Sequence, residues 1–246
     1  MGYFGLAGTL AMAVAPALGL YIISTINFTV LFVTSASLGL ITLLLGAAIH
    51  YRNISGPVQR GALFEKSALR PSVVIFFTTT TYGAIVSFIA LFAARKGIAN
   101  IGVFFTVYAF TLMLTRPVSG ILVDRKGFNV VVTPGVILIA AAMVVLSQAE
   151  TLWMFLLAGV IYGTGFGSVQ PSMQALAVKN VPPNRRGAAN GTFFSAFDMG
   201  IGVGATLWGY VSKFVDYSQM YLVAAVPALI ALLLYWLLSR KDAAPI

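Results

Sequence analysis

Eight long apolar stretches follow one another along the chain, separated by short segments that hold most of the polar and charged residues. Each stretch is close to the roughly 20 mostly apolar residues that an α-helix needs to cross a membrane. The pattern therefore predicts eight membrane-spanning helices in an all-α integral membrane protein. Their expected bounds are residues 3–23, 28–49, 73–94, 101–123, 130–147, 152–178, 188–211 and 219–238.

The composition agrees with this pattern. Of the 246 residues, 59% are hydrophobic and 9% are charged, and the mean hydropathy is +0.95. Soluble domains are about 45–50% apolar and about 25% charged, and disordered chains are polar and charge-rich. A soluble domain and a disordered chain are therefore both excluded. With no cysteine and one histidine, the chain offers neither a thiolate nor a multi-histidine metal site. We expect no metal, no cofactor and no enzyme activity.

The basic residues are distributed unevenly between the two sides of the membrane. The net charge is +9, but the cations lie between apolar stretches rather than in one stripe, so no nucleic-acid partner is expected. The fourth stretch and the segments after the second, fourth, sixth and eighth hold 12 of the 15 Lys and Arg residues. Cytoplasmic loops carry such an excess. We expect a multi-pass protein of the cell (inner or plasma) membrane with both termini in the cytoplasm.

A weak internal repeat relates the first and seventh stretches. A shift of 189 residues places Gly2 on Gly191 and Tyr21 on Tyr210. Weak internal symmetry of this kind is typical of transporters built from repeated halves. If the first stretch corresponds to the seventh, four helices are expected ahead of the first. We therefore expect an N-terminally truncated chain, or one that needs a second chain to supply these helices.

One family resemblance rests on a short loop motif. The segment Gly120-Ile-Leu-Val-Asp124-Arg125-Lys126-Gly127, preceded by Arg116-Pro117, resembles the helix–loop signature of the major facilitator superfamily between its eighth and ninth helices. The trailing basic residues of that signature are replaced by Phe128 and Asn129. The first stretch, with Pro16 and Gly19, resembles a degraded glycine–proline motif from the fifth helix of the drug:proton antiporters of this family.

The resemblance implies that the chain corresponds to helices five to twelve of the family. Residues 1–50 would be the last two helices of the N-terminal bundle, and residues 51–72 a cytoplasmic loop between bundles. Residues 73–238 would form a complete six-helix C-terminal bundle of two inverted three-helix repeats. Residues 239–246 would be a cytoplasmic tail.

Small residues at helical spacing indicate close packing between helices. Gly200 and Gly204 lie four residues apart, as do Gly163 and Gly167. In lipid, such faces let two helix backbones approach, because packing rather than hydrophobicity drives helix association there. These glycine runs also resemble a nucleotide-binding loop, but that fingerprint requires a preceding strand within a soluble βαβ unit. We therefore interpret them, with Pro16 and Gly19, as helix-packing positions.

Asp198 lies near the middle of the seventh stretch, about 15 Å deep at about 1.5 Å per residue. A carboxylate at that depth is costly and by default marks a functional site that faces the interior of a bundle. Low dielectric disfavours its charged form, which suits proton uptake and release. Three roles remain open: proton coupling, an ion pair with Arg116 on the fourth stretch, and substrate contact.

A second candidate device lies at the cytoplasmic end of the fourth stretch. A carboxylate such as Asp124 is stabilised at a helix N-terminus, where the dipole is positive. The pseudo-symmetry of the family implies that this N-terminus is the start of the first stretch, near residues 1–4. The predicted conformational latch comprises Gly120, Asp124, Arg125, Gly127, Arg185 and Arg186. The alternative is a solvated pair of loop charges.

The third and sixth stretches carry the candidate substrate cavity, because their family counterparts line the central cavity. Aromatic surfaces with a few hydrogen-bonding groups suit an amphipathic organic molecule. For each of these residues the alternative is packing between helices. The candidates are Phe77, Thr78, Thr81, Tyr82, Tyr162, Gln170 and Phe197. Trp153, Trp208, Trp236, Tyr217 and Tyr221 are interpreted as anchors at the membrane interface.

Two functions are compatible with these observations. The first is secondary active transport, with proton-coupled efflux of small amphipathic organic compounds by alternating access. Its partners would be the lipid bilayer, a small-molecule substrate and protons. The second is a membrane fragment or subunit that does not transport alone and needs a partner chain with the missing helices.

Overall fold

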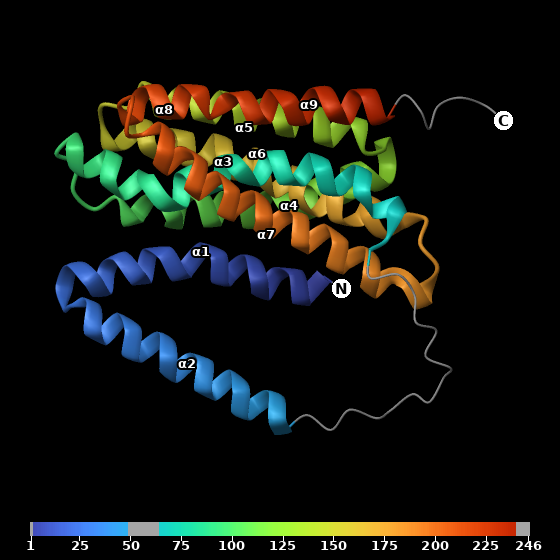
Figure 1. The fold of residues 1–246 in the computed structure, drawn as a ribbon, viewed down its shortest axis with the longest axis horizontal. Coiled ribbons are helices and arrows are strands. Elements are labelled where there is room, and N and C mark those ends of the chain that lie inside the picture. Colours follow the sequence, from blue (N-terminus) through green and yellow to red (C-terminus); the bar gives the residue numbers. More distant parts are fainter. Residues whose placement is uncertain (1, 49–63, 240–246) are drawn as a thin grey trace.

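In the parts that its computed structural model describes, residues 2–48 and 64–239, the chain consists of helices joined by turns and loops, with no strand (Figure 1). Most neighbouring helices are joined by short polar loops. Consecutive helices therefore run in opposite directions. The α-helices are α1 (Gly2–Thr25), α2 (Phe28–Ala48), α3 (Leu69–Arg95), α4 (Gly102–Lys126), α5 (Asn129–Ser147), α6 (Leu152–Lys179), α7 (Arg186–Val211), α8 (Tyr217–Val223) and α9 (Ala225–Ser239). Two 3₁₀ turns, Lys66–Ala68 and Pro183–Arg185, precede α3 and α7.

The eight predicted helices are present with small shifts at their ends, and the last one is broken. Its two parts, α8 and α9, meet at Ala224, three residues before Pro227. Proline has no N–H to donate to the carbonyl four residues earlier, which here belongs to Val223. The six-helix bundle also begins earlier than predicted, because α3 starts at Leu69 rather than within the apolar run at residue 73.

Helices α3 to α9 form one bundle, and α1 and α2 lie beside it (Figure 1). Within the bundle α3 packs against α7, α9 and α6, while α6 packs against α4 and α5. The bundle consists of two three-helix units, α3–α5 and α6–α9, where α8 and α9 count as one broken helix. If the two units are exchanged in order, the α3–α7 contact corresponds to the α6–α4 contact, and the α3–α9 contact corresponds to the α6–α5 contact. The contacts thus have the two-fold relation expected of repeated three-helix units.

The first two helices have a looser relation to this bundle. Helix α1 packs along α4, while α2 contacts α1 at their shared turn and diverges from the bundle (Figure 1). No residue of α2 is buried. Because α2 is apolar on every side, with a mean hydropathy of 2.2 over its best window, lipid can solvate it without further protein contact.

Six helical segments of the described residues are long and apolar enough to cross a membrane. Helix α7 is not among them although it has 26 residues. It carries Asn190, Ser195, Asp198 and Thr206, which lower its hydropathy. A helix of spanning length with this many polar groups must turn them towards protein or water.

Glycines set the distance between α7 and α3. A Cβ on Gly204 would lie 2.4 Å from the carbonyl oxygen of Thr80, and one on Gly83 would lie 2.6 Å from that of Ile201. Gly200 has an equally close neighbour in Phe76. These distances are shorter than any side chain tolerates, so the two backbones touch directly, as small residues permit in membranes.

The α6–α4 pair repeats this arrangement. A Cβ on Gly163 would lie 2.8 Å from the carbonyl oxygen of Tyr108, and one on Gly167 would lie 3.1 Å from that of Leu112. On the opposite side of α6, a Cβ on Gly165 would lie 2.6 Å from the carbonyl oxygen of Gly135 on α5. In α1, by contrast, a Cβ on Gly19 would make only an ordinary contact with Leu31 of α2, at 3.8 Å.

Two of the aromatic residues expected at the membrane interface are instead buried. Trp208 is 2% exposed and its indole N–H donates to the carbonyl oxygen of Thr80 at 2.9 Å. Tyr221 is 0% exposed and its hydroxyl donates to the carbonyl oxygen of Ala84 at 3.2 Å. The interface interpretation of both is wrong, because residues near a helix end can still face the neighbouring helix.

Replacing Gly204 with alanine is expected to destabilise the protein by about 1–3 kcal/mol, because the added methyl overpacks the α3–α7 contact. Gly202→Ala is the matched control on the same helix, since nothing lies within 4 Å of its added Cβ. The control is expected to be neutral, or stabilised by up to about 1 kcal/mol through helix propensity. Thermal unfolding in detergent measures both. Equal melting temperatures for the two variants would contradict the direct backbone contact.

Candidate functional site

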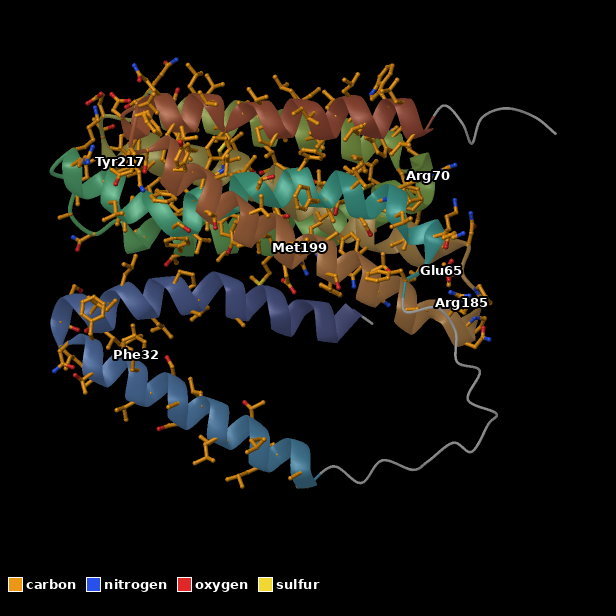
Figure 2. The ribbon with its side chains drawn as sticks, in the orientation of Figure 1. Phe32, Glu65, Arg70, Arg185, Met199 and Tyr217 are labelled. Atoms are coloured by element: carbon orange, nitrogen blue, oxygen red, sulfur yellow. The ribbon has the colours of Figure 1, made fainter. Side chains whose placement is uncertain are left out.

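Helix α7 has one buried stripe and one exposed stripe. Phe193, Phe197, Gly200, Gly204 and Trp208 recur at spacings of three and four residues and face the bundle interior. The opposite stripe contains Ser195, Asp198, Gly202 and Thr206, all of which are exposed. Met199, which is 62% exposed, lies on the side of the bundle nearest α1 in the view of Figure 2.

Asp198 therefore faces away from the interior of the six-helix bundle, which corrects the expected direction of its side chain. The sequence gives its depth, but its direction depends on which stripe of α7 carries the glycines that contact α3. No hydrogen bond or ion pair of Asp198 is present within the described parts of the chain. The proposed ion pair with Arg116 is thus not formed in this conformation.

Arg116 takes part in a network of amides instead. Its Nη2 donates to Oε1 of Gln170, and Nε2 of Gln170 donates to Oε1 of Gln174 at 3.4 Å. Nε2 of Gln174 then donates to Oδ1 of Asn190 at 3.4 Å, and Asn190 donates to the carbonyl oxygen of Arg186 at 3.2 Å. This amide network links α4, α6 and the start of α7.

An aromatic cluster occupies the bundle interior beside this network. Tyr82 stacks on Phe166 with ring centroids 5.4 Å apart and on Tyr162 at 6.4 Å. Tyr108 lies 5.8 Å from Tyr162, and Phe197 lies 6.2 Å from Phe166. The cluster thus draws one or more rings from each of α3, α4, α6 and α7.

Four of the predicted cavity residues lie together in or beside the aromatic cluster, and all four are buried: Thr81, Tyr82, Tyr162 and Phe197. Thr81 and Tyr162 share a hydrogen bond of 2.9 Å between their hydroxyls, and both are 0% exposed. The hydroxyl of Thr78 donates to the carbonyl oxygen of Val74 within its own helix. Only Phe77 of this set is partly exposed, and it contacts Phe76 edge-to-face at 5.3 Å.

Two members of the cluster, Tyr108 and Phe166, were not predicted from the sequence. Phe166 lies four residues after Tyr162, so both project from the same face of α6. That spacing was the available signal. Tyr108 lies in α4, and its ring meets the cluster because α4 and α6 lie close together.

The predicted latch residues fall into two separate groups. Gly120, Asp124 and Arg125 are exposed at the end of α4, and Gly127 ends that helix with φ of 84°, a backbone conformation that favours glycine. Arg185 and Arg186 lie at the start of α7 instead. The expected partner of Asp124 is the start of α1: Met1 lies outside the described residues, as do the side chains of the first helical turns.

Arg185 contacts a residue that the sequence did not single out. Its Nε lies 2.7 Å from Oε2 of Glu65, and the backbone N–H of Glu65 donates to the hydroxyl of Thr192 at 2.9 Å. Figure 2 shows Glu65 and Arg185 together at one end of the bundle. The segment that leads into α3 is thus fixed to the start of α7. Glu65 is the one acidic residue between the second and third apolar stretches, which was the available signal.

The local surroundings favour the ionised form of Glu65. Desolvation opposes ionisation, but the hydrogen bonds from Ser67 and the charge of Arg185 outweigh it and lower the pKa of Glu65 below its ordinary value of 4.5. The Glu65–Arg185 pair is therefore intact at neutral pH.

Within the described residues, no group of three or more His, Asp or Glu side chains is placed to hold a metal ion. The region where α4, α6 and α7 meet combines an exposed carboxylate on α7, an arginine that donates to Gln170 and a cluster of aromatic rings.

Comparison with known proteins identifies the family. Residues 72–245 match the family described as Major Facilitator Superfamily. The chain is 33% identical over 162 residues to "Uncharacterized MFS-type transporter YhhS" of Salmonella enteritidis PT4 (strain P125109). It is 32% identical over 161 residues to the protein of the same name from Escherichia coli (strain K12).

These matches cover 65% of this chain and 40% of each relative. The family match covers well over half of the chain, from the start of α3 onwards. The chain belongs to the Major Facilitator Superfamily and is a multi-pass membrane protein.

The Glu65–Arg185 pair makes stability depend on pH. Because the pKa of Glu65 is lowered by folding, its contribution is fully present above pH 4.5 and is lost as the pH falls through the lowered value. Glu65→Gln is expected to lower the melting temperature at neutral pH and to converge with wild type in acid. Thermal unfolding from neutral to acidic pH measures this. Glu150→Gln is the control, because that carboxylate is 65% exposed beside Lys96. A constant difference between Glu65→Gln and wild type would contradict it.

The Arg116–Gln170 contact is expected to be energetically coupled. Losing one partner of a charged hydrogen bond leaves the other partly unsatisfied. A double-mutant cycle of Arg116→Met and Gln170→Leu should therefore give a coupling free energy of about 1–3 kcal/mol. Unfolding by denaturant in mixed micelles measures the cycle. A parallel cycle of Arg116→Met with Gln148→Leu, an exposed residue after α5, should be additive within about 0.5 kcal/mol. Additivity in the first cycle would rule out the network.

Proposed function

We propose that this chain forms the C-terminal bundle and the adjoining two helices of a proton-coupled secondary transporter that exports small amphipathic organic compounds. The observation that carries the proposal is the exposed polar stripe of α7. Membership of the superfamily supports a transporter, and the direction of Asp198 supports coupling to protons.

The stripe has physical requirements that lipid does not meet. A carboxylate at the centre of a lipid-facing helix costs about 2.5–3.5 kcal/mol or more. Asp198 is near the middle of α7 and has no partner within the described residues. The stripe must therefore face a water-filled cavity or a second group of helices. Transporters built from two repeated bundles place such a cavity between the bundles, near the middle of the membrane.

Asp198 suits proton coupling because nothing in its own bundle fixes its charge. A carboxylate held by an arginine stays ionised, whereas one on a cavity wall responds to water and substrate. As the cavity opens to one side, Asp198 takes up a proton, and it releases the proton when the cavity opens to the other. Arg116, held by Gln170 inside the bundle, remains available as an electrostatic partner only if α4 or α7 moves.

Substrate contact is proposed for Phe77, the partly exposed member of the predicted cavity set, and for Phe194, which the sequence did not single out. Phe77 on α3 is half-buried and Phe194 on α7 is 38% exposed. Behind them, the buried rings of Tyr82, Tyr162 and Phe197 form a rigid apolar wall. Such a wall, with few hydrogen-bonding groups, suits a flat amphipathic compound.

Asp124 is proposed as part of a latch that holds one conformation. It is exposed at the end of α4, and α1 packs along α4. If its carboxylate meets the helix N-terminus of α1, the positive end of that dipole stabilises it. Gly120 and Gly127 would let the loop approach closely, and Arg125 would lie on its surface.

The second candidate function is a subunit that does not transport alone. It is supported by the uncovered stripe of α7 and by α1, which contacts the bundle along α4. Alternating access requires two bundles that rock against each other. We propose that helices completing the second bundle are needed for transport, whichever chain supplies them.

Asp198→Asn is expected to reduce substrate-driven proton flux to the level of empty liposomes, because asparagine keeps the size but cannot exchange a proton. The chain is reconstituted with and without the N-terminal half of the Escherichia coli relative. Ethidium is the test substrate, and pyranine inside the liposomes reports their internal pH. Proton flux driven by ethidium is expected only in liposomes that contain both bundles.

Asp216→Asn is the matched control, because Asp216 caps α8 through the N–H of Gln219 at 2.8 Å and asparagine caps helices equally well. Wild-type flux from Asp198→Asn with unchanged pH dependence would refute proton coupling through this residue. Flux from the chain alone that equals the two-part system would refute the need for a second bundle.

A further inference from the structure

A pocket opens at the end of the bundle where α3 begins and α6 and α9 end. Its volume is about 340 Å³, within the range of about 300–1,000 Å³ typical of small-molecule sites. It lies apart from the aromatic cluster and from the exposed stripe of α7. Figure 2 shows Arg70, one of its lining residues, near the end of the bundle that also holds Glu65 and Arg185.

Three cations from three helices line this pocket. Arg70 comes from the first turn of α3, Lys126 from the last residue of α4 and Lys179 from the last residue of α6. All three are exposed, so their charged ends lie at the rim. Among the described residues that line the pocket there is no Asp or Glu. Three positive charges converge on one opening, which favours an anion.

Neighbouring side chains hold this rim in shape. The ammonium of Lys179 lies 5.3 Å from the ring centroid of Phe128, which restrains the lysine by a cation–π contact. The hydroxyl of Tyr235 donates to Oδ1 of Asn129 at 2.6 Å and joins α9 to the start of α5. Gly127, with φ of 84°, turns the chain between Lys126 and Phe128.

The remaining wall of the pocket is apolar. It is formed by Pro71 and Val74 of α3, Met173 and Leu176 of α6, and Leu238 of α9. A free inorganic anion gains no favourable contact from an aliphatic wall. A phospholipid, by contrast, presents a phosphate for the cations and a hydrocarbon chain for the wall. The ends of spanning helices also lie at the level of lipid headgroups.

We propose that this pocket binds the phosphate of an anionic phospholipid, with Lys126, Lys179 and Arg70 around the headgroup and the aliphatic wall along the start of an acyl chain. Basic pockets between membrane helices on the cytoplasmic side recognise such headgroups. The excess of basic residues on this side of the chain predicts the same orientation. The site is distinct from the proposed transport pathway and does not depend on transport.

Native mass spectrometry of the purified full chain, titrated with phosphatidylglycerol or phosphatidylcholine, tests the proposal. Wild type is expected to bind phosphatidylglycerol about tenfold more tightly than the zwitterionic lipid. Lys126→Gln with Lys179→Gln should remove this preference. Lys126→Arg with Lys179→Arg keeps both charges and should retain it, which separates loss of charge from loss of fold.

The matched control is Lys66→Gln with Lys213→Gln, which changes the net charge equally at two exposed lysines outside the pocket. It should keep the wild-type preference. Equal binding of the two lipids by wild type, or equal loss in the pocket and control variants, would overturn the proposal. If inorganic phosphate at millimolar concentration displaces phosphatidylglycerol completely, the site is one for free phosphate and the lipid assignment is wrong.

Discussion

The direct contact of helix backbones through glycine determines most of this structure. Lipid offers no hydrophobic gain when two apolar helices meet, so association depends on close packing and on internal hydrogen bonds. Gly83, Gly200 and Gly204 bring α7 onto α3, and Gly163 and Gly167 bring α6 onto α4. The same approach lets Trp208 reach the carbonyl oxygen of Thr80. The aromatic cluster is a consequence, because its rings fill the space between these two pairs.

The glycine stripe also decides what α7 presents on its other side. Once Gly200 and Gly204 face α3, a residue two positions before Gly200 must point away from it. That residue is Asp198, whose exposure therefore follows from packing rather than from any interaction of its own carboxylate. Arg116, in contrast to Asp198, points into the bundle. It lies on the side of α4 that meets α6, and its guanidinium donates to the neutral amide of Gln170. One packing arrangement thus separates the two charges.

The sequence predicts well those features of the fold that depend on the length and apolarity of a segment. It predicts less well those that depend on which way a side chain faces. The spans follow from length and apolarity, and the family follows from the motif around Asp124. The break at Ala224 was foreseeable from Pro227, because proline removes one helical hydrogen bond. The direction of Asp198, the burial of Trp208 and the partner of Arg185 depend on helix rotation and on contacts between distant segments. Glu65 and Arg185 lie 120 positions apart in the chain, and no periodicity relates them.

Helix α3 is fixed at both ends to the loops on either side of α6. Before its start, Glu65 pairs with Arg185 in the α6–α7 loop, and just after its end Lys96 pairs with Glu150 in the α5–α6 loop. Each of these partly exposed ion pairs contributes little stability alone, but together they determine where α3 lies. They tie the first helix of one three-helix repeat to both ends of the first helix of the other. Together with the glycine contacts of α3 to α7 and of α6 to α4, these ion pairs fix the two repeats to each other, while the polar stripe of α7 remains exposed on the outside of the bundle.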